Sequence, residues 1–275
     1  MMNKVNKMLK DRTVLLTGAT GGIGSEIARL LSSNGAQLIL VDIHEPTLES
    51  LAKELGAGLP YIKTIAADLS TSQGRDSVSA FLDEQYDSLD VLINCAGINV
   101  FSMFTDLEDD QIEKMVSVNI TSPILLTKKL IPLLGKSNHS QIINFGSTFG
   151  SIGYPGFVTY SASKFAIRGF TEALRRELAK TNISVSYIAP RATRTNLNTG
   201  PVNDMNNALG VKMDTPLIVA AQVISILKDG RSSTRYIGWP EKLFVKINSL
   251  IPKLVDGALI KQLDTIKHYA NLNRS

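Results

Sequence analysis

The chain has 275 residues, of which 44% are hydrophobic and 20% charged, and its formal net charge is +4 at pH 7. This composition is typical of a folded globular protein and excludes a largely disordered chain. A small positive charge without a clustered basic stripe gives no indication of a nucleic-acid partner. The single cysteine, Cys95, excludes an internal disulfide framework and favours a reducing compartment, so we expect a cytoplasmic protein. Three dispersed histidines without a CxxC motif predict no metal site.

The first residues and the longest apolar run give no sign of targeting to a membrane. Residues 1–12 are basic and lack an apolar stretch, so we expect a solvated lead-in and not a signal peptide. The run at 217–227 is shorter than the roughly 20 residues that cross a bilayer. We therefore expect no transmembrane segment.

Short apolar runs alternate along the chain with longer segments of helical period. The runs that predict strands are 12–17, 37–42, 61–66, 89–94, 141–145 and 183–188. The segments that predict helices between them are 23–33, 46–55, 72–85, 107–134 and 161–180. This alternation predicts an α/β fold, a Rossmann-type doubly wound parallel sheet flanked by helices. We expect one domain over residues 1–238 and a C-terminal amphipathic helical extension over 239–275.

The first predicted strand leads into a glycine-rich turn that opens the first predicted helix. The turn reads Thr17-Gly18-Ala19-Thr20-Gly21-Gly22-Ile23-Gly24. Glycines here allow a tight turn and a close approach to a pyrophosphate, and the helix N-terminus offers free N–H groups to that anion. The turn lacks the Lys-Ser/Thr pair of a nucleoside triphosphate loop. The sequence therefore predicts a dinucleotide site.

Asp42 ends the second predicted strand, 18 residues after Gly24. An acidic residue at about that distance accepts hydrogen bonds from the adenosine ribose hydroxyls and would repel a 2′-phosphate. No arginine follows it, and Thr20 stands where a basic residue could pair with such a phosphate. The pattern favours NAD(H) over NADP(H). The alternative is that Asp42 caps the helix that begins near Pro46.

Tyr160 and Lys164 are four residues apart in a predicted helix, which places both side chains on one face. An ammonium beside a phenol favours the phenolate, so we expect Lys164 to lower the pKa of Tyr160. A tyrosine tuned in this way can exchange a proton with an alcohol or a carbonyl near neutral pH. Ser147 follows the predicted strand at 141–145, where its hydroxyl either orients a substrate oxygen or caps a turn.

The order and spacing of these motifs resemble those of the short-chain dehydrogenase/reductase family. The resemblance covers residues 11–238 and includes further short motifs, which are Asp68-Leu69, Asn94-Cys95-Ala96-Gly97 and Asn119. It implies an enzyme that interconverts an alcohol and a ketone or aldehyde by transferring a hydride to or from a nicotinamide cofactor. It also implies a homodimer or homotetramer.

The resemblance further implies a role for each matched residue. Tyr160 would be the general acid or base, and Lys164 would lower its pKa and bind the nicotinamide ribose. Ser147 would polarise the substrate oxygen, and Asn119 would hold a water linked to Lys164. The implied cofactor-binding residues are Gly18, Thr20, Gly21, Gly22, Ile23, Gly24, Asp42, Asp68, Leu69, Asn94, Ala96, Gly97, Tyr160, Lys164, Pro190, Thr193 and Thr195.

Two other functions stay open at this point. One is a non-catalytic regulator that kept the nucleotide-binding fold, which the intact set of Asn119, Ser147, Tyr160 and Lys164 disfavours. The other is an NADPH-dependent reductase of 3-oxoacyl substrates. Cys95 stands where the family has asparagine, and we expect a small buried residue there and not a nucleophile.

The segment after the sixth predicted strand departs from the family pattern of Pro-Gly. Arg191 follows Pro190, so a positive φ at that position would be strained. Either the loop is shaped differently or Arg191 reaches an acidic group. Arg191 and Arg194 either bind a carboxylate or phosphate of the substrate or are solvated loop charges.

Two later segments have no counterpart in the alternating pattern. Residues 196–212 are rich in Asn and Gly, so we expect a loop, either a plain one or a mobile substrate lid. Residues 239–269 repeat apolar side chains at spacings of three and four with lysines among them, and Pro240 and Pro252 predict the starts of two helices. This segment either packs on the core, covers an apolar pocket, forms a subunit interface or lies on an anionic membrane. We expect a lipophilic substrate, such as a fatty-chain, steroid-like or isoprenoid carbonyl compound.

Overall fold

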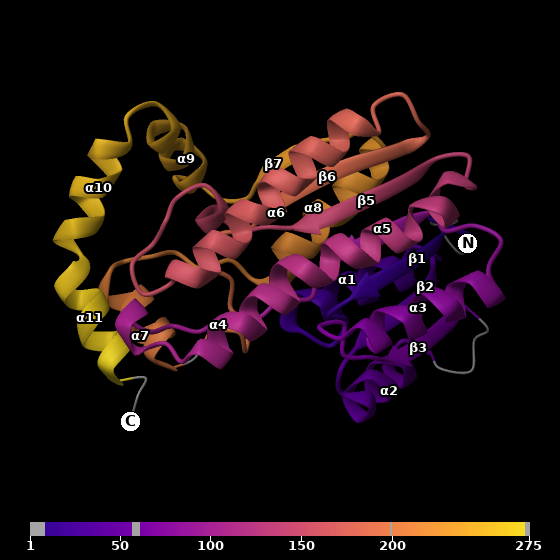
Figure 1. Ribbon diagram of the computed structural model, residues 1–275, viewed down its shortest axis with the longest axis horizontal. Helices are drawn as coiled ribbons and strands as arrows, with labels where there is room; N and C mark the ends of the chain where they lie inside the picture. The colour runs from indigo at the N-terminus through magenta and orange to yellow at the C-terminus, as the bar shows by residue number, and fades with distance from the viewer. Residues whose placement is uncertain (1–8, 57–60, 199, 273–275) are drawn as a thin grey trace, which may run out of the picture.

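The computed structural model describes residues 9–56, 61–198 and 200–272, so most of the basic lead-in lies outside the described residues. Within these ranges a seven-stranded parallel sheet has the order β3-β2-β1-β4-β5-β6-β7 (Figure 1). The strands are β1 (Thr13–Thr17), β2 (Gln37–Asp42), β3 (Ile62–Ala66), β4 (Val91–Asn94), β5 (Ser140–Phe145), β6 (Ile183–Ala189) and β7 (Thr234–Tyr236). The order reverses between β1 and β4, which confirms the predicted doubly wound, Rossmann-type sheet.

Helices cover both faces of this sheet. They are α1 (Gly22–Ser33), α2 (Glu45–Glu54), α3 (Ser72–Gln85), α4 (Asp109–Val116), α5 (Ser122–Gly135), α6 (Val158–Glu177), α7 (Gly200–Ala208) and α8 (Pro216–Asp229). Alternate residues of β1 divide between the two faces: Val14 and Leu16 pack towards α1 and α8, and Leu15 packs towards α3 and α5. Burial on both faces explains why each strand is apolar along its whole length.

Three details differ from the sequence-based expectations. The single helix expected over 107–134 is interrupted by a π-helical turn at Ser117–Thr121, between α4 and α5. The loop expected over 196–212 contains α7, because Val202 and Met205 are buried against Phe101 and Phe157. The sequence does not predict β7, because three half-exposed residues carry too little pattern.

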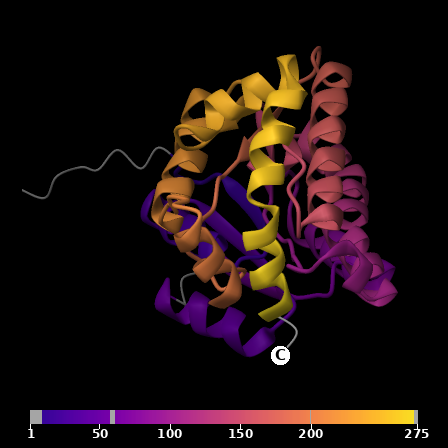
Figure 2. The ribbon, with the colours of Figure 1, turned by 90° about the vertical axis from the view of Figure 1, so that its left-hand side faces the viewer.

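Three further helices follow β7 in the described part of the chain, one more than the two prolines predict. They are α9 (Glu241–Leu250), α10 (Pro252–Lys261) and α11 (Leu263–Leu272). Figure 2 looks onto the end of the molecule that they cover. Ile266 and Ala270 of α11 are buried in the same cluster as Val202 and Met205 of α7. Among the described residues, no helix is both long enough and apolar enough to cross a membrane.

Candidate active site

A cavity of about 840 Å³ lies at the carboxyl ends of the strands, where doubly wound sheets bind ligands. One end is lined by the glycine-rich turn, Asp42 and Asp68, and the other by the side chains of Ser147 and Tyr160. The predicted site residues that line it are Gly18, Thr20, Gly21, Gly22, Ile23, Gly24, Asp42, Asp68, Leu69, Ala96, Gly97, Ser147, Tyr160, Lys164, Pro190, Thr193 and Thr195. Asn94 and Asn119 do not line it and lie behind its wall.

The glycine-rich turn has the shape that a pyrophosphate site requires. Gly18 has a φ of +67°, and a Cβ there would lie 2.7 Å from the Cα of Ala96. A Cβ on Gly24 would lie 2.0 Å from the carbonyl oxygen of Gly18. Gly21 caps α1 without a side-chain hydrogen bond, so no side chain of the cap competes for the first N–H groups of the helix. The turn therefore fits a dinucleotide phosphate.

Asp42 is held at the cavity by the same turn. Its Oδ2 accepts hydrogen bonds from the Thr20 backbone N–H at 2.9 Å and from the Thr20 hydroxyl at 2.6 Å. The alternative helix-capping role for Asp42 is wrong, because the residue that caps α2 is His44, whose Nδ1 accepts from the Thr47 N–H. Each carboxylate oxygen has two lone pairs, so Asp42 keeps acceptor capacity for ribose hydroxyls.

Asp68 and Asn94 hold neighbouring parts of the cavity wall. Asp68 accepts hydrogen bonds from Ser70 and from the Lys114 ammonium, at 3.2 Å for the latter. Hydrogen bonds from the Ser70 side chain, followed by those from its backbone and Lys114, outweigh burial and lower the pKa of Asp68. The Asn94 amide donates to Thr127 and Asn144 at 3.0 and 2.8 Å, which anchors the end of β4 beneath the wall.

Tyr160 and Lys164 project from α6 towards Ser147. The Lys164 Nζ lies 5.5 Å from the centroid of the Tyr160 ring and donates to the Phe145 carbonyl oxygen at 3.1 Å. The Ser147 Oγ accepts from the Phe149 N–H at 3.1 Å, and the Ser147 side chain lies close enough to the Tyr160 hydroxyl to act on its pKa. The sequence leaves open whether Ser147 orients a substrate oxygen or caps a turn; in the structure its side chain caps the turn at Thr148–Gly150, and the residue also lines the cavity.

The electrostatics of this pair differ from the sequence-based expectation. Burial raises the pKa of Tyr160 to about 12, and the hydrogen bond to Ser147 opposes that shift. Burial also lowers the pKa of Lys164 to about 8, because the ammonium is removed from water. The expected lowering of the Tyr160 pKa by Lys164 is therefore wrong for the protein on its own. The cause is desolvation of the buried phenol, which a spacing of four residues does not reveal.

Asn119 lies on the π-helical turn between α4 and α5. Its Oδ1 accepts from the Ile98 N–H at 2.9 Å, and its Nδ2 donates to the Ile98 carbonyl at 2.8 Å and to the Ser163 hydroxyl at 3.1 Å. A Cβ on Gly97 would lie 3.3 Å from Asn119 Oδ1 and 3.4 Å from Lys164 Nζ. Asn119 therefore holds the segment after β4 close beside Lys164.

The structure shows the environments of Cys95 and Arg191, the two residues that depart from the family pattern. Cys95 is half-buried and lines the cavity, so the expected fully buried position is wrong. Desolvation raises the pKa of its thiol to about 12, which keeps it protonated and agrees with the expectation of a non-nucleophilic residue. Arg191 forms ion pairs with Asp214 and Glu241, so of the alternatives above it reaches acidic groups of its own chain. Among the described non-glycine residues only Asp11 has a positive φ, so Arg191 is not strained. The Arg194 side chain is exposed.

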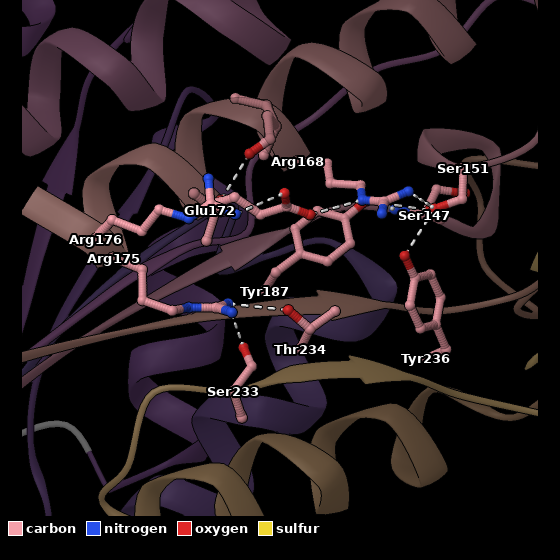
Figure 3. A network of polar contacts seen from close by, with 12 residues as sticks. Ser147, Ser151, Arg168, Glu172, Arg175, Arg176, Tyr187, Ser233, Thr234 and Tyr236 are labelled. Carbon is pink, nitrogen blue, oxygen red and sulfur yellow. Dashed lines mark hydrogen bonds and ion pairs between the residues drawn. The ribbon is translucent and has the colours of Figure 1, made fainter. Parts of the chain in front are cut away.

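Part of the cavity lining is apolar and comes from α9, α10 and the segment after β5: Phe149, Tyr154, Phe244, Ile247, Leu254 and Val255. The side chains of α9 and α10 belong to the apolar pattern of 239–269, so of the alternatives above this segment covers an apolar pocket. Phe149 and Tyr154 were not singled out from the sequence. Sequence reasoning also missed Tyr187 on β6, which is buried behind the cavity and whose hydroxyl contacts the backbone of Ser147 (Figure 3). An apolar strand position gives no signal for such a contact.

Comparison with known proteins agrees with this geometry. A family model described as short chain dehydrogenase matches residues 12–206. Nodulation protein G of Rhizobium sp. (strain N33) is 37% identical over 185 residues, which cover 66% of this chain and 73% of that protein. Dehydrogenase/reductase SDR family member 7B of Bos taurus is 28% identical over 263 residues, which cover 91% of this chain and 81% of that protein.

A solved structure shares the architecture. It is the 3-ketoacyl-(acyl-carrier-protein) reductase from Brucella melitensis complexed with NADH, with a TM-score of 0.76 and 26% sequence identity. The similarity covers 85% of this chain and 99% of the reductase. With the family model matching well over half of the sequence, this chain belongs to the short-chain dehydrogenase/reductase family of oxidoreductases.

Proposed function

We propose that this protein interconverts an alcohol and a ketone or aldehyde with NAD(H) as hydride carrier. The observation that carries the proposal is one continuous cavity with the glycine-rich turn and Asp42 at one end and Ser147, Tyr160 and Lys164 at the other. A dinucleotide extended from the turn towards α6 would bring its reactive end to these side chains. A protein that only binds nucleotides has no need of Ser147, Tyr160 and Lys164 together at that end of the cavity.

The residues of the turn and of the strand ends would hold the cofactor. The Gly18–Gly24 turn would bind the pyrophosphate, and Asp42 the adenosine ribose. Tyr160 and Lys164 would contact the nicotinamide ribose. The remaining contacts would come from Asp68, Leu69, Ala96, Gly97, Pro190, Thr193 and Thr195, all of which line the cavity. Asn94 and Asn119 would act from behind the wall.

Tyr160 and Ser147 would handle the proton of the reacting oxygen. The cofactor supplies or accepts the hydride when bound. In reduction, the Tyr160 hydroxyl gives its proton to the developing alkoxide while the Ser147 hydroxyl donates a hydrogen bond to it. Because the pKa of Tyr160 is raised to about 12, the phenol is protonated at neutral pH and ready to act as the acid. In oxidation, the Lys164 ammonium would stabilise the phenolate that acts as the base.

The preference for NAD(H) rests on Asp42 and Thr20. The carboxylate is fixed by Thr20 at the place of the ribose, where a 2′-phosphate would meet a like charge. His44, the nearest imidazole in the sequence, is engaged in capping α2. The NADH in the structure of the Brucella melitensis reductase supports the same choice.

A lipophilic substrate would fit the apolar half of the cavity. Phe244, Ile247, Leu254 and Val255 of the C-terminal extension face Phe149 and Tyr154 across it. These side chains offer dispersion contacts and few hydrogen-bond partners, which suits an alkyl chain or fused rings. The name of the Brucella melitensis reductase favours 3-oxoacyl thioesters as alternative substrates, and an NADPH-dependent reductase of such thioesters is the second candidate.

Cofactor titration followed by a substrate panel tests these proposals. NADH and NADPH are titrated into the protein and followed by fluorescence, and we expect NADH to bind at least tenfold more tightly. The panel comprises straight-chain 2-ketones and aldehydes of four to twelve carbons, the matching alcohols and 3-oxoacyl thioesters. We expect KM to fall as the chain lengthens. Binding of neither cofactor would overturn the enzyme assignment, and preference for NADPH with thioesters would select the second candidate.

The extension would also bring the cavity to a membrane surface. Trp239, Leu250, Ile251 and Ile260 are 59–80% exposed, and Phe244 and Leu254, which line the cavity, are 47% and 62% exposed. Lys242, Lys246, Lys253 and Lys261 lie among them. Apolar side chains flanked by lysines suit an anionic interface.

Vesicle flotation tests this membrane contact. We expect the protein to float with vesicles containing phosphatidylserine and not with neutral ones. The paired substitution Leu250→Glu with Ile251→Glu should abolish flotation, and Leu217→Glu with Ile218→Glu, a pair of exposed apolar residues on α8, is the matched control. Equal flotation of both variants would contradict the assignment.

A second copy of the chain would cover the α6 face, as the family resemblance implies. Phe104, Val158 and Phe165 are 43–54% exposed beside one another around a shallow hollow. Light scattering coupled to size exclusion should show a homodimer or homotetramer, and Phe165→Glu should shift it towards the monomer.

A further inference from the structure

Tyr187 is a buried member of a network of polar contacts that includes Ser147 (Figure 3). It comes from the middle of β6, paired in register with Asn144 of β5, and its side chain is fully buried. The ring occupies the space above Gly146, where a Cβ would lie 2.0 Å from the Tyr187 Cζ. Glycine at 146 is therefore what allows a tyrosine at this position of the strand.

The Tyr187 hydroxyl binds both backbone groups of Ser147. It accepts a hydrogen bond from the Ser147 N–H at 3.4 Å and donates one to the Ser147 carbonyl at 3.2 Å. Burial raises the pKa of Tyr187, so the phenol stays protonated and performs both roles. These two hydrogen bonds hold the peptide groups on either side of the Ser147 Cα, which restricts the direction of the Ser147 side chain.

The same hydroxyl lies where the Ser147 turn meets α6. A Cβ on Gly150 would lie 2.4 Å from the Tyr187 Oη and 2.7 Å from the Lys164 carbonyl oxygen. Gly150 thus lets the turn approach the helix that carries Tyr160 and Lys164. Tyr187 consequently contacts the segment that sets the distance between Ser147 and Tyr160.

Ser151, at the other end of the turn, has separate anchors. Its hydroxyl is hydrogen-bonded to Tyr236 at 2.8 Å and to the Arg168 Nη1 at 2.9 Å. Arg168 is in turn oriented by Glu172, with Nε to Oε1 at 2.9 Å. Because Ser151 has two anchors, loss of the Tyr236 hydroxyl leaves the Arg168 bond in place.

We propose that Tyr187 is a positioning residue that fixes the Ser147 hydroxyl against Tyr160 through the backbone of Ser147. The proposal rests on the proposed function, because Ser147 and Tyr160 act there on the same substrate oxygen. Tyr187 contacts no reacting atom and acts only through Ser147. Catalytic groups have to be held within about 0.5 Å of their productive geometry, and a shift of about 1 Å lowers rates by about 10²-fold.

Tyr187→Phe tests the proposal, because it keeps the ring over Gly146 and removes the hydroxyl alone. With the best ketone of the panel above, we expect kcat to fall by about 10- to 100-fold, with KM and the NADH dissociation constant within twofold of the wild type. Tyr236→Phe is the matched control and should stay within twofold in kcat. In a Ser147→Ala background, Tyr187→Phe should lower kcat by less than twofold further, since its effect passes through Ser147.

Hydrogen–deuterium exchange provides a readout that needs no substrate. Peptides that cover 146–151 should exchange at least tenfold faster in Tyr187→Phe, because this substitution removes the acceptor of the Ser147 N–H. In Tyr236→Phe the exchange of the Ser147 amide should be unchanged. Unchanged exchange in Tyr187→Phe overturns the proposal. Faster exchange with a wild-type kcat overturns it as well, and so does a loss of kcat on Tyr187→Phe that is equally large with Ser147 and with Ser147→Ala. If the wild type reduces no member of the panel, the proposed function fails, and exchange alone then decides whether Tyr187 holds Ser147.

Discussion

Arg191 and Asp214 form a paired contact between two segments that follow different elements of the fold. The Arg191 Nε donates to Asp214 Oδ2 at 3.0 Å, and its Nη2 donates to Oδ1 at 2.7 Å. The two side chains are only 13% and 8% exposed. The remaining Nη1 donates to the Trp239 carbonyl at 3.0 Å and to Glu241 at 3.2 Å. One guanidinium thus ties the end of β6 to the segment before α8 and to the start of α9.

Substitution Arg191→Met should loosen the C-terminal extension. It leaves Asp214 without its partner in a buried position, and removing one member of a buried pair costs about 3–5 kcal/mol. We expect a loss of that size in urea unfolding followed by circular dichroism, together with faster proteolysis within 241–262. Arg194→Met removes an exposed arginine from the same loop and is the control. Equal stability of the two variants would show that the ion pair does not hold the extension.

Substitution Tyr160→Phe should abolish turnover and keep cofactor binding. The ring stays in place against Phe149 and Phe157, and the proton donor is lost. General acid catalysis contributes about 10²- to 10⁴-fold, so kcat should fall at least that far. The NADH dissociation constant, measured by fluorescence, should change by less than threefold. An active Tyr160→Phe enzyme would contradict the assignment of the proton donor.

The double substitution Thr20→Arg with Asp42→Ser should reverse the cofactor preference. Asp42 loses its charge, and an arginine on the turn can form charge-assisted hydrogen bonds with a 2′-phosphate. A hydrogen bond to a charged group contributes about 1.5–3 kcal/mol, so NADH should bind about tenfold more weakly or worse and NADPH more tightly. His44→Ala is the control, because His44 only caps α2. An unchanged ratio of the two dissociation constants would exclude Asp42 as the residue that contacts the ribose.

The buried Lys164 should make stability depend on pH in a defined window. Its pKa is lowered from an ordinary 10.5 to about 8, so the folded protein loses this proton at lower pH than the unfolded chain. Between pH 8 and 10 the unfolded chain holds more protons, and the free energy of unfolding therefore rises with pH.

The variant Lys164→Met has no titrating group at this position, so its free energy of unfolding lacks this rise with pH. We expect it to be more stable than the wild type at pH 7 and to lose that advantage as the pH rises from 8 to 10, measured by urea unfolding. Lys180→Met changes an exposed lysine just after α6. Its free energy of unfolding should differ from that of the wild type by the same amount at every pH. If the free energies of unfolding of Lys164→Met and the wild type differ by the same amount at every pH, the lowered pKa of Lys164 is contradicted.

Local features of the sequence were sufficient for the scaffold and for most of the cavity. Apolar runs at 37–42 and 183–188 predict strands within one residue of β2 and β6, because burial on both faces requires an apolar residue at every position. The glycine-rich turn follows from the steric demands of a tight turn at Gly18, which the φ of +67° bears out. Tyr160 and Lys164 share a helix, so their spacing alone places them together.

The contacts that only the tertiary structure decided join segments that are far apart in the chain. The partners of Arg191 come from residues 23 and 50 positions away, and Tyr187 reaches Ser147 across 40 positions. Such contacts depend on how helices and strands pack, which the pattern within one segment does not encode. The same holds for the pKa of Tyr160: its neighbour Lys164 predicts a lowering, but burial by the whole fold raises it. The sequence by itself determined the scaffold, the glycine-rich turn and most of the polar residues that line the cavity. The packed structure determined their protonation, their anchoring and the aromatic side chains of Phe149 and Tyr154 beside them.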